Sequence, residues 1–246
     1  MSIRINSNLL DKFFSLYRSS DQISLANLSE IILFTCSINQ VLRFVVTSDF
    51  ASQIQNTLND TGLYFYSGNL YLSRKINGWT SISNDSMNNK DYEIETLLVM
   101  GYDDSSVKDC YEKELNGDFH NSGKYFNYPD CCITNYPLIS SSEENWANTI
   151  LELSGDGPYP CWSNRLATGW GGTSLSGELF PCSLHCEHAN EIGKSTYNSL
   201  KELGLKRLAE EFLQQSLFPV IIHMNGKVER AEHPSMHNHN LIKFKL

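Results

Sequence analysis

The chain has 246 residues, of which 41% are hydrophobic and 19% are charged. This composition is typical of a globular protein with a packed core and excludes a disordered chain. The formal net charge of -9 disfavours nonspecific binding to nucleic acid, which requires a basic surface.

The sequence shows no targeting or membrane segment. Residues 1–20 carry four charged side chains and therefore lack the apolar core of a signal peptide. The longest apolar run, at residues 31–34, is far too short to span a bilayer. We therefore expect a cytoplasmic protein without a membrane partner. In a reducing compartment, its seven cysteines are expected to be thiols or metal ligands rather than disulfides.

The N-terminal half predicts helices alternating with strands. Apolar positions three and four apart indicate helices over residues 7–18 and 24–36. The elements predicted after them are a strand at 42–46, a helix at 49–59 capped by Ser48, a hairpin at 62–74 with its turn at 67–69, a loop over most of 76–92, a strand at 94–100 and a helix at 105–115.

The C-terminal half predicts mostly helices and ends in strands. Its predicted elements are a loop at 116–129, a short helix from the first cysteine pair, helices at 143–154, 182–203 and 205–216, strands at 218–223 and 228–230 joined by a type I′ turn at Asn225-Gly226, and a last strand at 241–245. We predict an α+β fold. An N-terminal α/β subdomain is expected over residues 1–115, with a soft boundary. A helical cysteine-motif, metal-binding domain is expected over residues 116–246, ending in a small antiparallel sheet.

Four of the seven cysteines lie in two short clusters about fifty residues apart. Cys131 and Cys132 form the first, and Cys182 and Cys186 form the second. Because Cys182 and Cys186 are four residues apart at a predicted helix start, we expect them on one helical face. The helix dipole there favours thiolate, the form that binds metal. Cys131 and Cys132 are expected to point apart and to compete for one or two ligand positions.

Three kinds of site are consistent with these thiols. The first is an iron–sulfur cluster, expected as 4Fe-4S, held by Cys132, Cys182, Cys186 and in some arrangements Cys131, with an open iron that binds substrate. The second is a zinc site with four thiolates, or with His185 or His188 as a nitrogen ligand. The third is a metal-free nucleophilic or redox thiol pair. Four cysteines buried as small apolar residues are the alternative without chemistry.

Three motifs around the cysteines resemble the pattern of an uncharacterised prokaryotic family, a domain of unknown function. Its members run roughly G-Y-P-P-C-C-V, then N-R, then P-C-S-x-x-C at a helix start. The matching segments here are Tyr128-Pro129-x-Cys131-Cys132, Asn164-Arg165 and Pro181-Cys182-Ser183-x-x-Cys186. The resemblance covers about residues 95–225 and implies a shared cysteine site without implying a reaction. This sequence departs from the pattern with Asn127 before the tyrosine and Asp130 after the first proline. Cys161 lies outside the pattern.

Polar residues near the second cluster predict a substrate site. Asn190 and Lys194 continue the expected face of Cys182 and Cys186, and they are candidates to hydrogen-bond a substrate and to hold its carboxylate or phosphate. Arg165 is the best candidate for bidentate anion binding. Gly193 in mid-helix indicates the close approach of another backbone or of a ligand. Residues 169–172 are expected to form a flexible flap over the site.

A histidine-rich segment precedes the last predicted strand. His233, His237 and His239, with His223 nearby in sequence, form a second possible metal site, but an exposed polar loop is favoured over it. Several standard motifs are absent, namely G-x-S-x-G, H-E-x-x-H, G-x-G-x-x-G after a strand and C-x-x-x-C-x-x-C.

The leading hypothesis from the sequence is an iron–sulfur enzyme that performs lyase, sulfur or redox chemistry. Its substrate is expected to be a small polar or anionic molecule, bound near Arg165 and Lys194. The alternatives are a zinc-stabilised binding or scaffold domain and a metal-free thiol enzyme.

Overall fold

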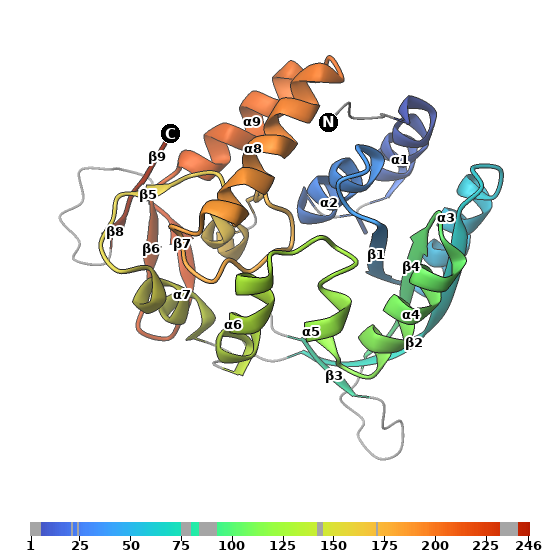
Figure 1. The fold of residues 1–246 in the computed structure, drawn as a ribbon, viewed down its shortest axis with the longest axis horizontal. Coiled ribbons are helices and arrows are strands. Elements are labelled where there is room, and N and C mark those ends of the chain that lie inside the picture. The colour runs from blue at the N-terminus through green and yellow to red at the C-terminus, as the bar shows by residue number, and fades with distance from the viewer. Residues whose placement is uncertain are drawn as a thin grey trace. The chain divides into compact units, whose positions relative to one another are not determined.

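The computed structural model describes residues 6–20, 22–23, 25–74, 80–83, 93–141, 145–170, 172–231 and 241–246. The chain forms two compact units (Figure 1). Residues 34–127, with the first helix, form the N-terminal unit, and residues 128–246 form most of the C-terminal unit. Residues 25–33 group with the C-terminal unit, although they lie about one hundred residues before it in the chain. The domain boundary at residue 115 stays a prediction.

The N-terminal unit is built on one antiparallel sheet with the strand order β1-β4-β2-β3. β4 lies between β1 and β2. Its Gly101 is opposite Val41 of β1 and Tyr64 of β2. The strands are β1 (Val41–Val46), β2 (Tyr64–Arg74), β3 (Thr80–Ser83) and β4 (Glu93–Gly101), and the helices are α1 (Ser7–Ser19), α3 (Ser48–Leu58), α4 (Asp104–Leu115) and α5 (Phe119–Ser122).

Helices cover both faces of this sheet. On β1, Phe44 packs against Phe13 of α1, with ring centroids 6.2 Å apart. The neighbouring Arg43 forms an ion pair with the buried Glu114 of α4. Because adjacent side chains of a strand point to opposite faces, α1 and α4 lie on opposite sides of the sheet. This two-sided cover explains why β4 is buried from Thr96 to Met100.

Two local predictions in this unit are wrong. The expected hairpin at 62–74 is the single strand β2, which runs through the expected turn. Gly68 lies within this strand, where a larger residue would clash, because its Cβ would stand 2.1 Å from the hydroxyl of Tyr111. The cap of α3 is Thr47, whose hydroxyl accepts from the N–H of Phe50, rather than Ser48.

The C-terminal unit combines helices with short strands. β6, β7 and β8 form an antiparallel sheet with β6 in the centre, and β5 pairs in parallel with β9. The α+β class and the small C-terminal antiparallel sheet are therefore confirmed. The elements are α2 (Leu25–Thr35, its last two residues in the other unit), α6 (Asp130–Ser141), α7 (Trp146–Ser154), β5 (Tyr159–Pro160), the 3-10 helix η2 (Arg165–Trp170), α8 (Glu187–Glu202), α9 (Lys206–Leu217), β6 (Val220–Ile222), β7 (Val228–Arg230), β8 (Leu241–Ile242) and β9 (Phe244–Lys245).

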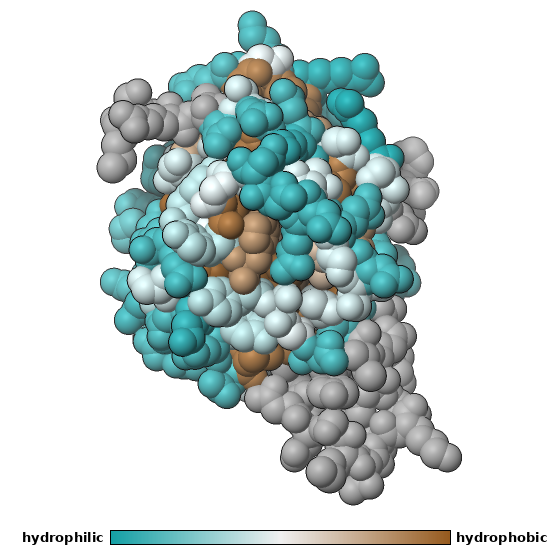
Figure 2. All heavy atoms as spheres, turned by 90° about the vertical axis from the view of Figure 1, so that its right-hand side faces the viewer, coloured by the Kyte–Doolittle hydropathy of each residue, from teal (hydrophilic) through white to brown (hydrophobic). Residues whose placement is uncertain are grey.

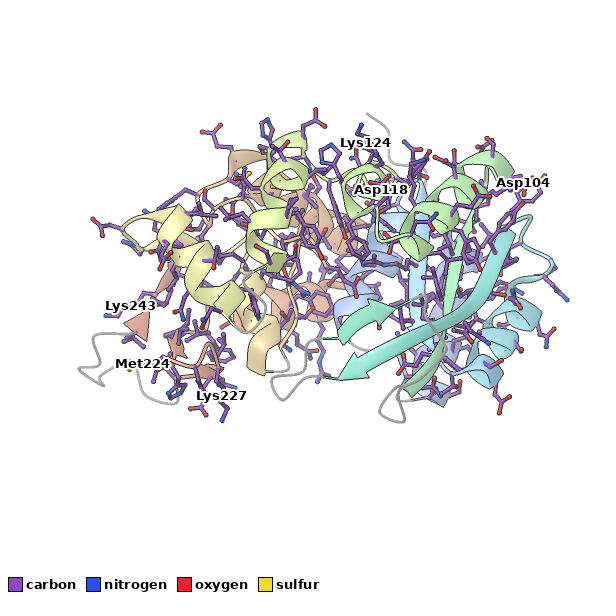
Figure 3. The ribbon with its side chains drawn as sticks, turned by 90° about the horizontal axis from the view of Figure 1, so that it is seen from below. Asp104, Asp118, Lys124, Met224, Lys227 and Lys243 are labelled. Carbon is purple, nitrogen blue, oxygen red and sulfur yellow. The ribbon has the colours of Figure 1, made fainter. Side chains whose placement is uncertain are left out.

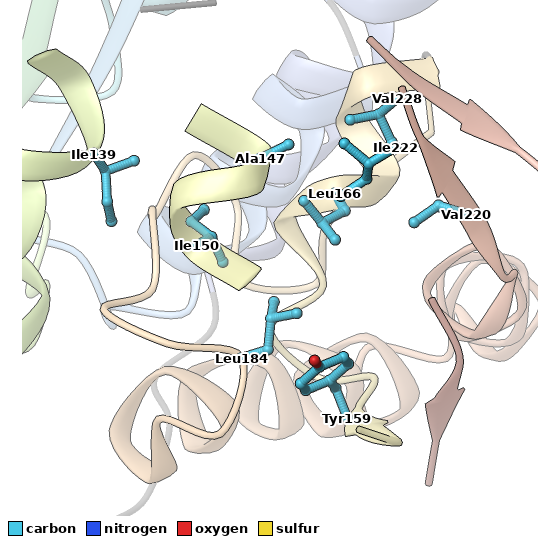
Figure 4. Packing of buried hydrophobic residues seen from close by; sticks show 9 residues of the cluster. All are labelled: Ile139, Ala147, Ile150, Tyr159, Leu166, Leu184, Val220, Ile222 and Val228. Atoms are coloured by element: carbon cyan, nitrogen blue, oxygen red, sulfur yellow. The ribbon is translucent and has the colours of Figure 1, made fainter. Parts of the chain in front are cut away.

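The core of the C-terminal unit brings its helices and its sheet together. Figure 4 shows nine residues of this cluster, drawn from α6, α7, β5, η2, β6, β7 and the loop before α8. Leu184 is the member from that loop and is fully buried. The loop that carries the second cysteine cluster is therefore anchored in the core. The members are Ile139, Ala147, Ile150, Tyr159, Leu166, Leu184, Val220, Ile222 and Val228.

The β6–β7 hairpin differs from its prediction. The N–H of Gly226 donates to the carbonyl of His223, and Gly226 has a φ of 78°. This is a three-residue loop with one left-handed position, whereas a type I′ turn would also require positive φ at Asn225. Met224 stands at the tip of this hairpin, where it is 95% exposed (Figure 3).

The chain between η2 and the second cysteine cluster runs inside the C-terminal unit. Thr173 and Ser174 are fully buried. The hydroxyl of Ser29 in α2 donates to the carbonyl of Ser174 and lies 3.2 Å from the hydroxyl of Thr173. These hydrogen bonds satisfy polar groups that would be costly to bury alone, and they explain why α2 belongs to this unit.

The surface is mostly polar. Hydrophilic residues cover most of the face shown in Figure 2, with small hydrophobic areas between them. Among the residues that the structure describes, no helix combines the length and the apolar character needed to cross a bilayer.

Gly193 offers a test of the packing between α8 and the chain before η2. A Cβ at this position would stand 1.9 Å from the carbonyl oxygen of Trp162. We expect Gly193→Ala to lower the free energy of unfolding by about 2 kcal/mol, because overpacking outweighs the gain of about 1 kcal/mol in helix propensity. Urea denaturation measures this change. Asn198→Ala, at an exposed position of α8, is the control, with an expected change within about 0.5 kcal/mol.

Candidate metal centre

The first cysteine pair lies in the first turn of α6. Asp130 is the first residue of this helix, followed by Cys131 and Cys132. The first position of a helix suits both an acidic side chain and a proline. Asp130, which stands where the resembling pattern has its second proline, is therefore compatible with a helix start. Asn127 has a φ of 53°, in the left-handed region that glycine and asparagine tolerate best. The departure at Asn127 is therefore also compatible with the local backbone.

The second cysteine pair is not arranged as the sequence predicted. α8 begins at Glu187, Cys186 is its N-cap residue, and Cys182 lies in the preceding loop. The chain is held out of a helix because Leu184 enters the core and its N–H donates to the hydroxyl of Ser154 at 2.7 Å. The expectation of one helical face for Cys182 and Cys186 is wrong, and the loop instead turns both sulfurs toward the first pair.

All four sulfurs lie together. The Sγ atoms of Cys131, Cys132, Cys182 and Cys186 are all within 4.8 Å of one another. Cys186 Sγ lies 3.7 Å from the sulfurs of both Cys131 and Cys132, which are 3.9 Å apart. Cys131 and Cys132 therefore do not point apart, because neighbours in a helix are rotated by only about 100°. No disulfide joins these free thiols, and no other metal-binding group of three or more residues occurs in the described part of the chain.

The site combines burial with two helix starts. The side chains of Cys132 and Cys186 are 1% and 8% exposed, and Leu179, Ala189, Tyr128 and Ile192 pack around the cluster. The N-termini of α6 and α8 both meet the sulfurs, and the positive ends of their dipoles stabilise negative charge there. The backbone N–H of Cys182 also donates to Cys132 Sγ at 3.4 Å. The helix starts and this N–H stabilise negative charge on the sulfurs, while Cys132 and Cys186 are shielded from water and Cys131 and Cys182 are partly exposed.

Three of the four thiols have pKa values shifted from the ordinary value of cysteine, and in different directions. Hydrogen bonding from the Cys132 thiol, with help from the backbone N–H of Ala189, lowers the pKa of Cys186 to about 4. Burial, together with hydrogen bonding to Cys186, raises the pKa of Cys182 to about 12. The pKa of Cys132 is also raised, first by its hydrogen bond to Cys186 and then by burial. Of these three thiols, Cys186 is therefore the one whose surroundings favour the thiolate form.

Asn190 supports the cysteine loop from within α8. Its side-chain amide donates to the carbonyls of Cys186 at 2.8 Å and of Leu184 at 3.3 Å. Its oxygen accepts from the hydroxyl of Ser163 at 3.2 Å. The side chain is 5% exposed and its hydrogen bonds hold the second cysteine segment in place. A contact between Asn190 and a substrate stays a prediction.

Lys194 and Arg165, the two predicted anion binders, lie in different surroundings. The ammonium of Lys194 forms an exposed ion pair with Glu191 on α8 at 2.7 Å. Arg165 opens η2, and its guanidinium lies over the ring of Phe180, 4.6 Å from the centroid. Burial lowers the pKa of Arg165, while the nearby carboxylates of Glu178 and Glu30 oppose that effect.

The guanidinium of Arg165 has unused donors. Its Nε and Nη1 atoms are buried, and no group in the described part of the chain accepts a hydrogen bond from them. Glu30 comes from α2 and accepts from the Tyr128 hydroxyl and from the N–H of Glu178. The sequence gave no signal that these residues meet, because Glu30 lies 98 residues from Tyr128 and 148 residues from Glu178 along the chain.

The backbone approach predicted for Gly193 is confirmed by the contact with Trp162 described above. Gly169 belongs to η2, where a Cβ would stand 2.6 Å from Val228 of β7, so this part of the expected flap is packed on the sheet. The rest of the flap includes residue 171, which lies outside the described residues.

The two histidines of the second cluster take different positions. His188 Nδ1 lies 3.8 Å from Cys131 Sγ. His185 is 3.0 Å from the carbonyl of Asp156 and packs against the ring of Tyr159. His188 is therefore the histidine that faces the cluster.

Of the four histidines in the predicted second metal site, only His223 belongs to the described residues. His223 is paired with Glu229 on the β6–β7 hairpin at 3.0 Å. His233, His237 and His239 lie outside the described residues, so the predicted tail site stays a prediction.

No family model, curated protein or solved structure matches this chain. The resemblance to a family of unknown function stays a prediction, and the function must be argued from the site itself.

The pKa values predict how metal affinity depends on pH. Cys132 and Cys182 hold protons at neutral pH and must release them when a metal binds, whereas Cys186 is already a thiolate. Between about pH 6 and pH 8 we expect the logarithm of the apparent zinc association constant to rise by at least about two per pH unit. Competition titration against a chelator of known proton affinity measures the slope. An affinity that is independent of pH would contradict these assignments.

Proposed function

We propose that the C-terminal unit binds one zinc ion through Cys131, Cys132, Cys182 and Cys186, and that the ion stabilises a binding or scaffold domain. The observation that carries this proposal is the spacing of the sulfurs. Four thiolates arranged tetrahedrally at about 2.3 Å from one zinc ion are separated by about 3.8 Å from each other. The three separations among Cys131, Cys132 and Cys186 are 3.7 to 3.9 Å and agree with this value. The fourth sulfur, of Cys182, lies within 4.8 Å of the other three.

The spacing is less favourable for the iron–sulfur cluster that leads the sequence-based hypotheses. In a 4Fe-4S cluster each thiolate binds a different iron, so the four sulfurs lie farther apart than the ligands of one ion. An open iron would also require that only three cysteines bind, whereas here a fourth sulfur lies within 4.8 Å of the others. The iron–sulfur enzyme therefore becomes the second candidate.

A stabilising role follows from what the ion would connect. Four protein ligands complete a tetrahedron and leave no position for substrate, as in structural zinc sites. Cys132 and Cys186 are separated by 54 residues, and the ion would tie the start of α6 to the start of α8. Closing such a long loop restricts the unfolded chain, and metal binding then contributes directly to folding.

Metal analysis of anaerobically purified protein tests this proposal. We expect a colourless protein with about one zinc per chain and no acid-labile sulfide. Cys132→Ala should lose the metal. Cys161→Ala is the matched control, because Cys161 is equally buried but lies outside the cluster, and it should keep the metal. A brown protein that contains iron and sulfide in similar amounts would contradict the zinc site and favour the iron–sulfur enzyme.

A second candidate function is recognition of a small carboxylate or phosphate by Arg165, as predicted from the sequence. The observation in its favour is the pair of buried guanidinium nitrogens, Nε and Nη1, for which the described part of the chain offers no acceptor. Such donors are costly to leave unused. Nε and Nη1 lie on different edges of the guanidinium, and an anion that accepts from either one would offset part of the cost. The carboxylates of Glu178 and Glu30 beside them favour a ligand that also carries a donor or a positive charge.

Thermal shift with amino acids, dicarboxylates and inorganic phosphate tests this second function. We expect a member of the panel to stabilise the wild-type chain but not Arg165→Lys, which keeps the charge and loses the fork of donors. Lys194→Gln is the control and should respond as the wild type does, because Lys194 is engaged with Glu191. A response that survives in Arg165→Lys, or none in the wild type, would contradict the candidate.

A further inference from the structure

The four cysteines of the cluster are not equally enclosed. Cys132 and Cys186 are 1% and 8% exposed, whereas Cys131, in the first turn of α6, and Cys182, in the loop before α8, are partly exposed. His188 lies on the surface in the first turn of α8, immediately beside Cys131. Its Nδ1 is 3.8 Å from Cys131 Sγ, a distance similar to those that separate the sulfurs themselves.

We propose that His188 is a reserve ligand of the metal site and takes the place of Cys131 when that thiolate is lost. This inference rests on the proposed zinc site and extends it by a fifth ligand. Imidazole nitrogen binds zinc at about 2.0–2.1 Å, and sets of three cysteines and one histidine are common in structural sites. Replacement of Cys131 by His188 leaves a four-coordinate ion and changes only one corner of the tetrahedron.

The surroundings single out this corner and this histidine. Cys132 accepts the N–H of Cys182, so its sulfur is fixed by the backbone of the opposite segment. His185 is also close in sequence, but its ring engages the carbonyl of Asp156. Among the described residues, only Cys131 of the four cysteines has an imidazole nitrogen within 4 Å of its sulfur, which is why this corner is the one that His188 can complete.

Cobalt substitution tests this inference in the full-length chain. Co²⁺ replaces zinc in thiolate sites, and its visible and near-ultraviolet bands report how many sulfurs and nitrogens bind it. In the wild type we expect a four-sulfur spectrum. In Cys131→Ser, which keeps the size of the side chain, we expect one cobalt with a weaker sulfur charge-transfer band and d–d bands shifted to higher energy, as for one nitrogen and three sulfurs.

A double-mutant comparison then assigns the nitrogen. His188→Ala should change the metal affinity less than about 3-fold when Cys131 is present and lower it at least about 100-fold in the Cys131→Ser background, the scale expected for one of four ligands. His185→Ala in the Cys131→Ser background is the matched control and should change little. Equal loss of affinity from His188→Ala in both backgrounds, or none in either, would overturn the inference.

A second route avoids any variant that fails to fold. Folded, cobalt-loaded wild type is treated with iodoacetamide, whose CH₂ carbon is attacked by the exposed Cys131 sulfur while iodide leaves. Peptide mass spectrometry confirms the modified residue. We expect the modified wild type to retain cobalt and modified His188→Ala to release it. Release from both chains would overturn the reserve role of His188, whereas a wild type that binds no metal at all would overturn the proposed zinc site instead.

Discussion

Four sulfurs gathered in a partly buried space can hold a metal ion, and the proposed zinc site connects the other features of the C-terminal unit. Taking thiolates out of water is costly, and two helix dipoles and a few N–H donors offset only part of that cost. The pKa of Cys186 is accordingly lowered, whereas the pKa values of Cys132 and Cys182 are raised, so negative charge is favoured on only one of these three sulfurs. In the proposed site a divalent ion would displace the protons of Cys132 and Cys182 and bind all four sulfurs. The separations among Cys131, Cys132 and Cys186 are those expected for ligands of one tetrahedral ion.

The supporting residues act through the backbone that carries the cysteines. Leu184 fixes the second segment in the core, and Asn190 holds the carbonyls on either side of the turn into α8. Gly193 lets α8 lie against the carbonyl of Trp162. These contacts place Cys182 and Cys186 before any metal arrives, so the ion needs to organise little more than the sulfurs themselves. The fold therefore brings the four sulfurs together with Cys132 and Cys186 buried, Cys131 and Cys182 partly exposed, and His188 beside Cys131.

Local patterns predicted the helices well, because apolar spacing and caps act within a few residues. α1, α2, α4 and α9 begin and end within about two residues of their predicted bounds. Predictions that depended on distant partners were less reliable. The turn expected at 67–69 is part of a strand because β2 pairs with β4, and Gly68 leaves room for the hydroxyl of Tyr111 from α4.

The gathering of the four cysteines was foreseen from their types and clustering, but their spacing suggested a helical face that the core contact of Leu184 prevents. The surroundings of Arg165 could not be foreseen, because Glu30 reaches it from α2.

X-ray absorption spectroscopy of the metal-loaded full-length protein tests the central claim most directly. For one zinc ion held by the four cysteines we expect a zinc edge with a single shell of four sulfur neighbours at about 2.3 Å and no metal neighbour beyond it. An iron edge with a second shell of iron neighbours would show that the cysteines hold a cluster, and it would contradict the assignment of a single tetrahedral ion.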